Sequence, residues 1–198
     1  MQAPVVPDAK KVMRQRIIAL RDALSVDERD QESAAITSKL IALPAFARAR
    51  TIAAFASFGT EFDTGEFLAV TLRQGKRLVL PRIQPGRREL RFHFVASLTE
   101  SLIAGQCGIP EPDPSLCVEA DPGEIDFMLV PGVAFTPHCE RLGYGGGFYD
   151  IAIGNTRADT LKVAAVFNLQ VVDAIPLEPH DRCVDLVVTE RASYAAHS

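Results

Sequence analysis

Short apolar segments alternate with helical patterns along most of this chain, and the alternation restricts the folds that it can adopt. Apolar or alternating runs predict strands at 51–55, 77–80, 90–95, 127–130, 162–167 and 184–188. Helices are expected between strands, at 65–73 and 148–155. Parallel strands joined by helices bury both faces of their sheet. The sequence therefore predicts an α/β domain of three layers, with a mostly parallel sheet flanked by helices.

Two further helices are expected before the first strand. Asp8 can cap the first, which would run to about residue 24 with an apolar face at Met13, Ile17, Leu20 and Leu24. A capping box at 25–28 opens the second, which has a core face at Ile36, Leu40 and Leu43. The proline-rich segment 108–123 is expected to be a long irregular connection.

The composition is that of an ordinary globular protein, with 198 residues of which 47% are hydrophobic and 23% charged. We expect one domain over residues 1–198, with residues 1–7 as a flexible N-terminus. The net charge of −4 argues against broad, unspecific nucleic-acid binding. Because no apolar run reaches membrane-spanning length and no signal-peptide core opens the sequence, we expect neither membrane insertion nor secretion.

The cysteines and histidines form none of the common metal or catalytic motifs. Widely spaced thiols without a C-x-x-C pair indicate reduced cysteines in a cytoplasmic protein, at Cys107, Cys117, Cys139 and Cys183. The four histidines include no H-E-x-x-H pattern, and the sequence has no G-x-S-x-G. A zinc site, a disulfide framework and a hydrolase triad therefore have little support.

The densest chemistry lies in the glycine stretch, which reads Arg141-Leu142-Gly143-Tyr144-Gly145-Gly146-Gly147-Phe148-Tyr149-Asp150. Its glycines leave backbone N–H groups free to close around an anion. Arg141 can pair with phosphate oxygens, Asp150 can hold a hard divalent cation, and the aromatic rings can cover a planar ligand. A flexible linker is the alternative, but linkers are rich in Gly and Ser without these other side chains. The stretch suggests a nucleotide phosphate beside an aromatic second substrate.

Two other groups of charged residues have both a structural and a functional interpretation. Lys10 and Arg14 stand one helical turn apart, and their spacing favours an exposed charged face over phosphate recognition. Glu61 lies in the loop 56–64, between Phe58 and Phe62. It is either solvated near the next helix or accepts hydrogen bonds from an amino-substituted heterocycle on which a phenyl ring packs.

Asp185 sits inside the apolar segment 183–188, where an unpaired carboxylate would be costly to bury. Either it lies at the solvated end of the strand or it has a cation or hydrogen-bond partner. Asp150 and Asp185 together would suit magnesium, which takes one or two protein carboxylates plus phosphates and water.

The chain resembles the 5-formyltetrahydrofolate cyclo-ligases, also called 5,10-methenyltetrahydrofolate synthetases. The matching motifs are Lys10-x-x-x-Arg14, the loop 55–64 with Glu61, Gly108-Ile109-Pro110-Glu111-Pro112, Val130-Pro131-Gly132-Val133-Ala134-Phe135 and the glycine stretch. The resemblance implies a Rossmann-like fold similar to the NagB/RpiA/CoA-transferase-like fold. It also implies a monomer that acts on small molecules, converting 5-formyltetrahydrofolate to 5,10-methenyltetrahydrofolate with ATP and magnesium and releasing ADP and phosphate.

The resemblance further implies which residues form the site. ATP would meet Lys10, Lys11, Val12, Met13, Arg14, Arg141, Leu142, Gly143, Tyr144, Gly145, Gly146, Gly147, Phe148 and Tyr149. The folate would meet Ala56, Glu61, Tyr144, Gly145, Gly146, Gly147 and Phe148. Arg141 and Tyr149 are expected to be catalytic, and magnesium is expected at Asp150 and Asp185. The chain departs from some relatives at Gly146, where they carry lysine, and at Ile151, where many bacterial relatives carry arginine.

Two alternatives from other functional classes remain. One is a catalytically silent relative that binds a nucleotide or RNA. The other is an enzyme of similar fold that acts on sugar phosphates or CoA esters and has no use for ATP.

Overall fold

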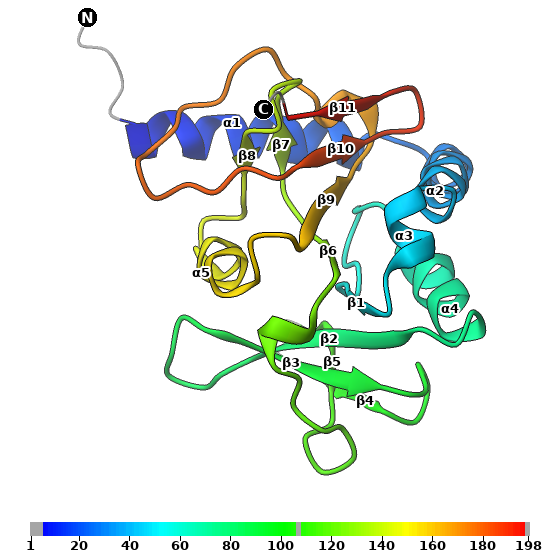
Figure 1. Ribbon diagram of the computed structural model, residues 1–198. Helices are drawn as coiled ribbons and strands as arrows, with labels where there is room; N and C mark the ends of the chain where they lie inside the picture. The colour runs from blue at the N-terminus through cyan, green and yellow to red at the C-terminus, as the bar shows by residue number, and fades with distance from the viewer. Residues whose placement is uncertain (1–5, 106–107, 197–198) are drawn as a thin grey trace, which may run out of the picture.

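The computed structural model describes residues 6–105 and 108–196, so Cys107 and His197 lie outside the described residues. Its centre is a seven-stranded sheet in the order β11-β10-β9-β6-β1-β2-β3 (Figure 1). The strands are β1 Thr51–Ala53, β2 Arg77–Ile83, β3 Leu90–Val95, β6 Phe127–Leu129, β9 Leu161–Ala165, β10 Leu186–Val188 and β11 Ser193–Ala195. The five inner strands pair in parallel and the two edge strands are antiparallel, which confirms the mostly parallel sheet.

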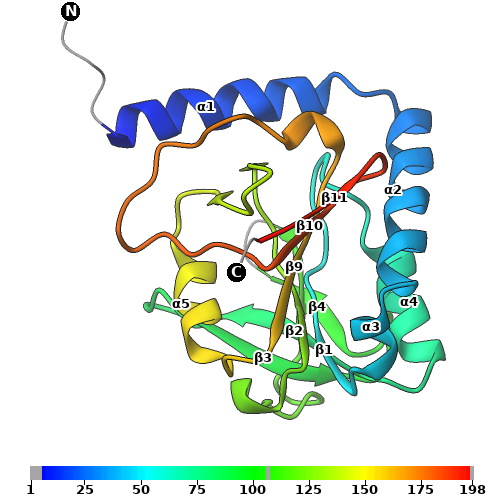
Figure 2. The same cartoon turned by 45° about the horizontal axis from the view of Figure 1, so that its top comes forward.

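Helices cover both faces of this sheet, as the two views show (Figures 1 and 2). On one face lie α2 Val26–Ile41, α3 Pro44–Arg48 and α4 Gly65–Arg73, and on the other lies α5 Phe148–Asn155. Alternate strand residues face opposite ways. Ile52 and Phe127 therefore pack with α2 to α4, whereas Ala53 and Met128 pack with α5. The predicted three layers are confirmed.

Helix α1, Val6–Asp22, runs across one end of the sheet and differs from its prediction in three ways (Figure 2). Val6 and Pro7 belong to the helix rather than to a flexible end, and residues 1–5 lie outside the described residues. Asp8 lies in the first turn rather than at the cap. Leu20 is 47% exposed, so it was wrongly placed on the apolar face.

The buried face of α1 carries cationic side chains. Lys10, Ile17 and Arg21 are all at most 5% exposed, and Arg14 is half-buried. These positions follow one another by three or four residues and so form one stripe along a helix. The prediction of an exposed charged face is therefore wrong for Lys10. The stripe borders the polar cavity at Lys10 and Arg14 and a small apolar cluster at Ile17, so hydrophobic periodicity detected only part of this buried face.

Several short strands and turns were not predicted from the sequence. Within the segment expected to be irregular, β5 Pro110–Pro112 pairs with β4 Leu102–Ala104. A second small hairpin joins β7 Ala134–Phe135 to β8 Arg141–Leu142. Two 3-10 turns are also present, η2 Pro122–Glu124 and η3 Asn168–Gln170. The two-residue strands are too short to show a periodic pattern, and prolines at both ends of β5 argue against a strand there.

The capping box at 25–28 is confirmed, because the Ser25 hydroxyl accepts the N–H of Glu28 and the Glu28 carboxylate accepts the N–H of Ser25. Ile36 and Leu40 are fully buried on the predicted core face of α2. Cys117, Cys139 and Cys183 are free thiols. In the described part of the chain, no helix has both the length and the apolar character needed to cross a membrane.

Candidate functional site

A cavity of about 830 Å³ opens beyond the carboxyl end of β1, and most residues of the predicted site line it. This volume is within the usual range of small-molecule sites. The walls come from α1, the loop after β1, the β2–β3 hairpin, β5, the glycine stretch with α5, and the segment 173–183, here called the strap. Predicted residues in the lining are Lys10, Arg14, Ala56, Glu61, Arg141, Leu142, Gly143, Tyr144, Gly145, Gly146, Gly147, Phe148, Tyr149 and Asp150.

The glycine stretch is tied at its two ends by an ion pair. Arg141 on β8 donates from Nη2 to Oδ1 of Asp150 on α5, at 2.6 Å. The backbone N–H of Arg182 donates to the same oxygen at 3.1 Å. Between these ends, Gly145 has φ 99° and Gly147 has φ 70°. Side chains other than glycine rarely adopt such backbone angles, so the loop shape depends on both glycines.

Two buried donors of the glycine stretch have no hydrogen-bond partner within the described residues, namely Nε of Arg141 and the hydroxyl of Tyr149. Burial, and secondarily the charge of Glu61, raises the pKa of Tyr149, so its hydroxyl keeps its proton. Unsatisfied buried donors are costly. Because both residues line the cavity, a ligand with acceptor oxygens could satisfy them.

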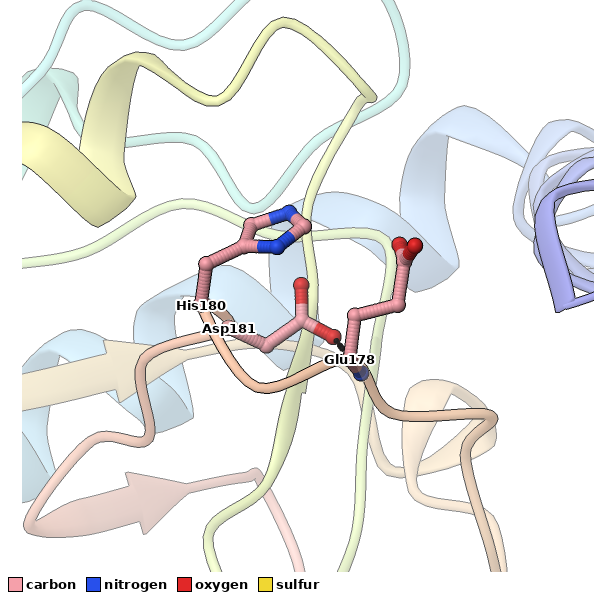
Figure 3. Close-up of side chains that lie close together, drawn as sticks. All are labelled: Glu178, His180 and Asp181. Carbon is pink, nitrogen blue, oxygen red and sulfur yellow. Dashed lines mark hydrogen bonds between the residues drawn. The ribbon is translucent and has the colours of Figure 1, made fainter.

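Lys10 is already paired inside the cavity. Its Nζ lies 2.7 Å from Oε2 of Glu178 and 2.6 Å from Oδ2 of Asp181, both in the strap. Burial alone would lower the pKa of Lys10, but the hydrogen bonds to Asp181 and Glu178 outweigh it and raise the pKa. Glu178, His180 and Asp181 lie close enough together to suggest a metal site (Figure 3). The ammonium group of Lys10, however, already forms an ion pair with each of the two carboxylates.

The rest of the predicted α1 motif is divided between the cavity and the surface. Arg14 lines the cavity and donates from Nε to the carbonyl oxygen of Gly143 at 2.8 Å. Lys11 and Val12 are exposed, and Met13 packs against a small apolar cluster. None of these three residues lines the cavity.

Glu61 is buried and held by the glycine stretch. The hydroxyl of Tyr144 donates a short hydrogen bond to Oε1, and the N–H of Phe58 donates to Oε2 at 3.1 Å. Arg21 on α1 donates in turn to the Tyr144 hydroxyl at 2.9 Å. Burial raises the pKa of Glu61, although the Tyr144 hydroxyl, the Phe58 N–H and Arg21 oppose the shift.

The aromatic side chains next to Glu61 do not behave alike. Phe58 is 41% exposed, lines the cavity and lies 5.4 Å from the Tyr144 ring, centroid to centroid. Phe62 is 2% exposed and belongs to the hydrophobic core. Of these two phenylalanines, Phe58 is therefore the one placed to pack on a ligand held by Glu61.

The structure does not bring Asp185 to this cavity. Its Oδ2 accepts the backbone N–H of Lys162 at 2.7 Å and lies 3.8 Å from Nζ of the same lysine. The carboxylate therefore has the hydrogen-bond partner that the sequence led us to expect. That partner, Lys162, lies near the amino end of β9. Asp150 and Asp185 do not meet in the lining of one site.

Several lining residues had no predicted role. Glu111 is 6% exposed and reaches the cavity from β5, inside a motif that marked the resemblance. Further polar lining residues without a predicted role include Arg88 of the β2–β3 hairpin and the strap residues Glu178, His180, Asp181 and Arg182. Strap residues have no periodic signal, and Lys10 is 168 positions from Glu178 in the chain. Only the motif around Glu111 was detectable beforehand.

Comparison with known proteins shows the family of this chain. The family model described as the 5-formyltetrahydrofolate cyclo-ligase family matches residues 6–190. The chain belongs to this family of enzymes. Cyclo-ligases of Mycolicibacterium smegmatis and Escherichia coli K12 are each 29% identical, over 96% and 90% of this chain and 98% and 96% of the relatives.

Solved structures agree with the family assignment. The 5,10-methenyltetrahydrofolate synthetase of Aquifex aeolicus matches with a TM-score of 0.84 and 31% identity, over 96% of this chain and 93% of that chain. The synthetase of Mycoplasma pneumoniae, 24% identical with a TM-score of 0.74, shares the fold over 91% of this chain and 98% of that chain.

The paired state of Lys10 leads to a stability prediction. Burial alone would raise the pKa of Asp181, but the hydrogen bonds from Lys10 and the Glu178 N–H lower it. The pair therefore stabilises the fold above the ordinary pKa of aspartate. This contribution is lost as the pH falls through the lowered value, and also as rising pH removes the proton from Lys10.

We expect Lys10→Ala to lower the free energy of unfolding by about 1–3 kcal/mol at neutral pH, less than for a fully buried pair because both carboxylates are partly solvated. The difference from wild type should shrink in acid. Lys11→Ala, next in the chain but exposed, is the control, and its effect should stay within about 0.5 kcal/mol. Urea unfolding at several pH values measures this. Equal stability of Lys10→Ala and wild type at neutral pH would contradict the pairing.

Proposed function

We propose that this protein converts 5-formyltetrahydrofolate to 5,10-methenyltetrahydrofolate in a reaction that consumes ATP, requires magnesium and releases ADP and phosphate. Its relatives carry the names of this reaction. The observation that carries the proposal is that one cavity is lined by both the anion-binding glycine stretch and the buried carboxylate of Glu61. Tyr144 belongs to the stretch and also binds Glu61, so it joins the two halves.

The reaction needs activation of a poor leaving group. The formyl oxygen of the substrate takes the γ-phosphoryl group, and ADP leaves. N10 then attacks the formyl carbon, the carbon–oxygen bond breaks with release of phosphate, and N10 loses its proton. Such a sequence depends on positioning and charge neutralisation more than on a covalent protein nucleophile.

The phosphate half of the cavity has the groups that this chemistry requires. Arg14 and the backbone of the glycine stretch would hold the phosphate chain, with Arg141 and Tyr149 donating from their unpaired Nε and hydroxyl groups. Charged donors of this kind form strong hydrogen bonds to phosphate. Lys10 lies in the same wall and would act from within its pair with Glu178 and Asp181.

Of the two predicted magnesium ligands, Asp150 is suitably placed and Asp185 is not. Asp150 lines the cavity, and both of its described hydrogen bonds go to Oδ1, which leaves Oδ2 without a partner in the described part of the chain. One carboxylate oxygen with phosphates and water is a common magnesium environment. Bound there, the ion would neutralise charge on the phosphates. We do not place Asp185 in this shell, because it lies outside the cavity lining.

The folate half combines Glu61 with an aromatic surface. The pterin ring presents adjacent N–H donors, which a carboxylate can accept as a pair. Phe58 and Phe148 line the same cavity and could cover the ring faces. The other predicted folate contact, Ala56, adds a small side chain to this wall.

The direct test adds 5-formyltetrahydrofolate, ATP and magnesium to the protein and follows the methenyl chromophore. Product should form only with all three, and excess chelator should stop it. Full turnover without ATP would contradict the proposal. Full turnover in chelator would contradict the metal requirement alone.

The role of Glu61 is tested by Glu61→Gln. The amide replaces one acceptor by a donor, so affinity for 5-formyltetrahydrofolate should fall by about tenfold to a hundredfold while ATP affinity stays unchanged. Because burial raises the pKa of Glu61, wild-type folate affinity should also decline with acidification at a higher pH than for an ordinary glutamate. Calorimetric titration of both ligands measures this.

Glu66→Gln is the control for that substitution, since Glu66 is exposed on α4 and lies outside the cavity. It should bind both ligands as wild type does. Unchanged folate affinity in Glu61→Gln would remove Glu61 from the site.

A further inference from the structure

The cavity lining has five basic and five acidic side chains, but not every cation is paired with one of the acids. The basic side chains in its lining are Lys10, Arg14, Arg88, Arg141 and Arg182. Lys10 is paired with Glu178 and Asp181, and Arg141 with Asp150. Within the described part of the chain, the Arg14 side chain bonds only to a carbonyl oxygen. The side chains of Arg88 and Arg182 form no hydrogen bond or ion pair with any residue in the two described ranges, 6–105 and 108–196.

Of these unpaired cations, Arg88 lies against the glycine stretch. Its Cδ and Nη1 atoms are 3.5 Å from the point where a Cβ atom on Gly147 would stand. Gly147 is the N-cap of α5, so the guanidinium group lies beside the amino end of that helix. Arg14 approaches the same loop at Gly145, with its Cζ 3.4 Å from the corresponding point. Two arginines from different elements therefore converge on one short loop.

The position of Arg88 is set by a regular turn. The N–H of Gln84 donates to the carbonyl of Glu89 at 3.0 Å, and the N–H of Arg87 donates to the carbonyl of Gln84 at 3.1 Å. Gly86 within the turn has φ 75°, which suits glycine. The hairpin thus holds Arg88 over the cavity through backbone contacts, without any partner for its side-chain charge.

We propose that Arg88 is a phosphate-binding residue, which clamps the phosphate chain of the nucleotide against the glycine stretch from the β2–β3 hairpin. The inference rests on the proposed function. Converging positive charges repel one another unless an anion lies between them. A helix amino end and free backbone N–H groups favour an anion at the same place. A nucleoside triphosphate satisfies all of these groups at once, and arginine can bind its oxygens in pairs.

Phosphate is favoured over the carboxylates of the folate tail because of where Arg88 lies. It touches the loop beside Gly147, and the adjoining residues of the stretch include the unpaired donor of Tyr149 and the free carboxylate oxygen of Asp150. Glu61, the expected pterin ligand, binds to Tyr144 at the other end of the loop. Arg88 therefore belongs to the phosphate half of the cavity.

The same hairpin provides a matched control. Arg87 is adjacent to Arg88, but its side chain is 73% exposed and does not line the cavity. Its Nη1 atom lies 4.0 Å from Oε2 of Glu89. Arg88→Ala and Arg87→Ala remove the same charge from the same turn. A difference between them therefore reports on the cavity rather than on net charge or hairpin stability.

The experiment titrates magnesium-ATP and, separately, 5-formyltetrahydrofolate into wild type, Arg88→Ala, Arg88→Lys and Arg87→Ala by calorimetry. Arg88→Ala should weaken ATP binding by about tenfold to a hundredfold, as expected for a charge-assisted contact. The affinity of Arg88→Ala for the folate should stay within about twofold of wild type. Its KM for ATP should rise as its ATP binding weakens. Arg88→Lys should recover part of the loss, and Arg87→Ala should match wild type.

Two results would overturn the assignment. One is equal ATP affinity in Arg88→Ala and wild type. The other is weakened folate binding with unchanged ATP binding, which would assign Arg88 to the carboxylate tail of the folate. A wild-type protein that neither binds ATP nor forms methenyl product would instead contradict the proposed function itself.

Discussion

The hydroxyl group of Tyr144 ties together three segments that are far apart in the sequence. It accepts a hydrogen bond from Arg21 on α1 and donates one to Glu61 in the loop after β1, while its own backbone belongs to the glycine stretch. Burial raises the pKa of this phenol, with the charge of Glu61 as the next cause, so the hydroxyl keeps the proton that it donates. Because one hydroxyl contacts all three segments, it fixes the glycine stretch relative to the buried carboxylate of Glu61.

Ion pairs inside the cavity hold two of its cations in place. Arg141 is fixed by Asp150, and Lys10 is fixed by two strap carboxylates, so both cations are oriented before any ligand arrives. Oriented charges of this kind need little reorganisation during reaction. The remaining positive charge lies on arginines that reach the glycine stretch from α1 and from the β2–β3 hairpin. The site thus combines two cations oriented by ion pairs with arginines that have no acidic partner among the described residues.

Much of the fold could be predicted because its longer elements follow simple patterns. The helices at Gly65–Arg73 and Phe148–Asn155 and the strand at Leu90–Val95 agree with their predictions residue for residue. Strands β1, β6 and β9 end before their predicted ends, where side chains beyond the ladder are still buried, as Phe55 is. Strand β2 instead runs past its predicted end, and β11 was not predicted. Hydrophobic periodicity detects burial, and burial does not stop where strand pairing stops.

The features that the sequence did not reveal are those set by contacts between distant residues. The charged stripe of α1 faces a cavity whose far wall, the strap, comes from the other end of the chain. Arg88 reaches Gly147 only because the β2–β3 hairpin lies beside α5. The apolar segment around Asp185 correctly indicated that its carboxylate has a partner. The segment did not indicate that this partner is the backbone N–H of Lys162. Tertiary placement decides these roles, and no local pattern encodes it.

The central claim is that one cavity transfers the γ-phosphoryl group of ATP directly to the formyl oxygen of the folate. The most direct measurement uses 5-formyltetrahydrofolate labelled with oxygen-18 in the formyl group, with mass analysis of the released inorganic phosphate. The account predicts that each turnover carries the label into phosphate, because the carbon–oxygen bond breaks after that oxygen has been phosphorylated. Unlabelled phosphate, with the label recovered in water, would contradict it.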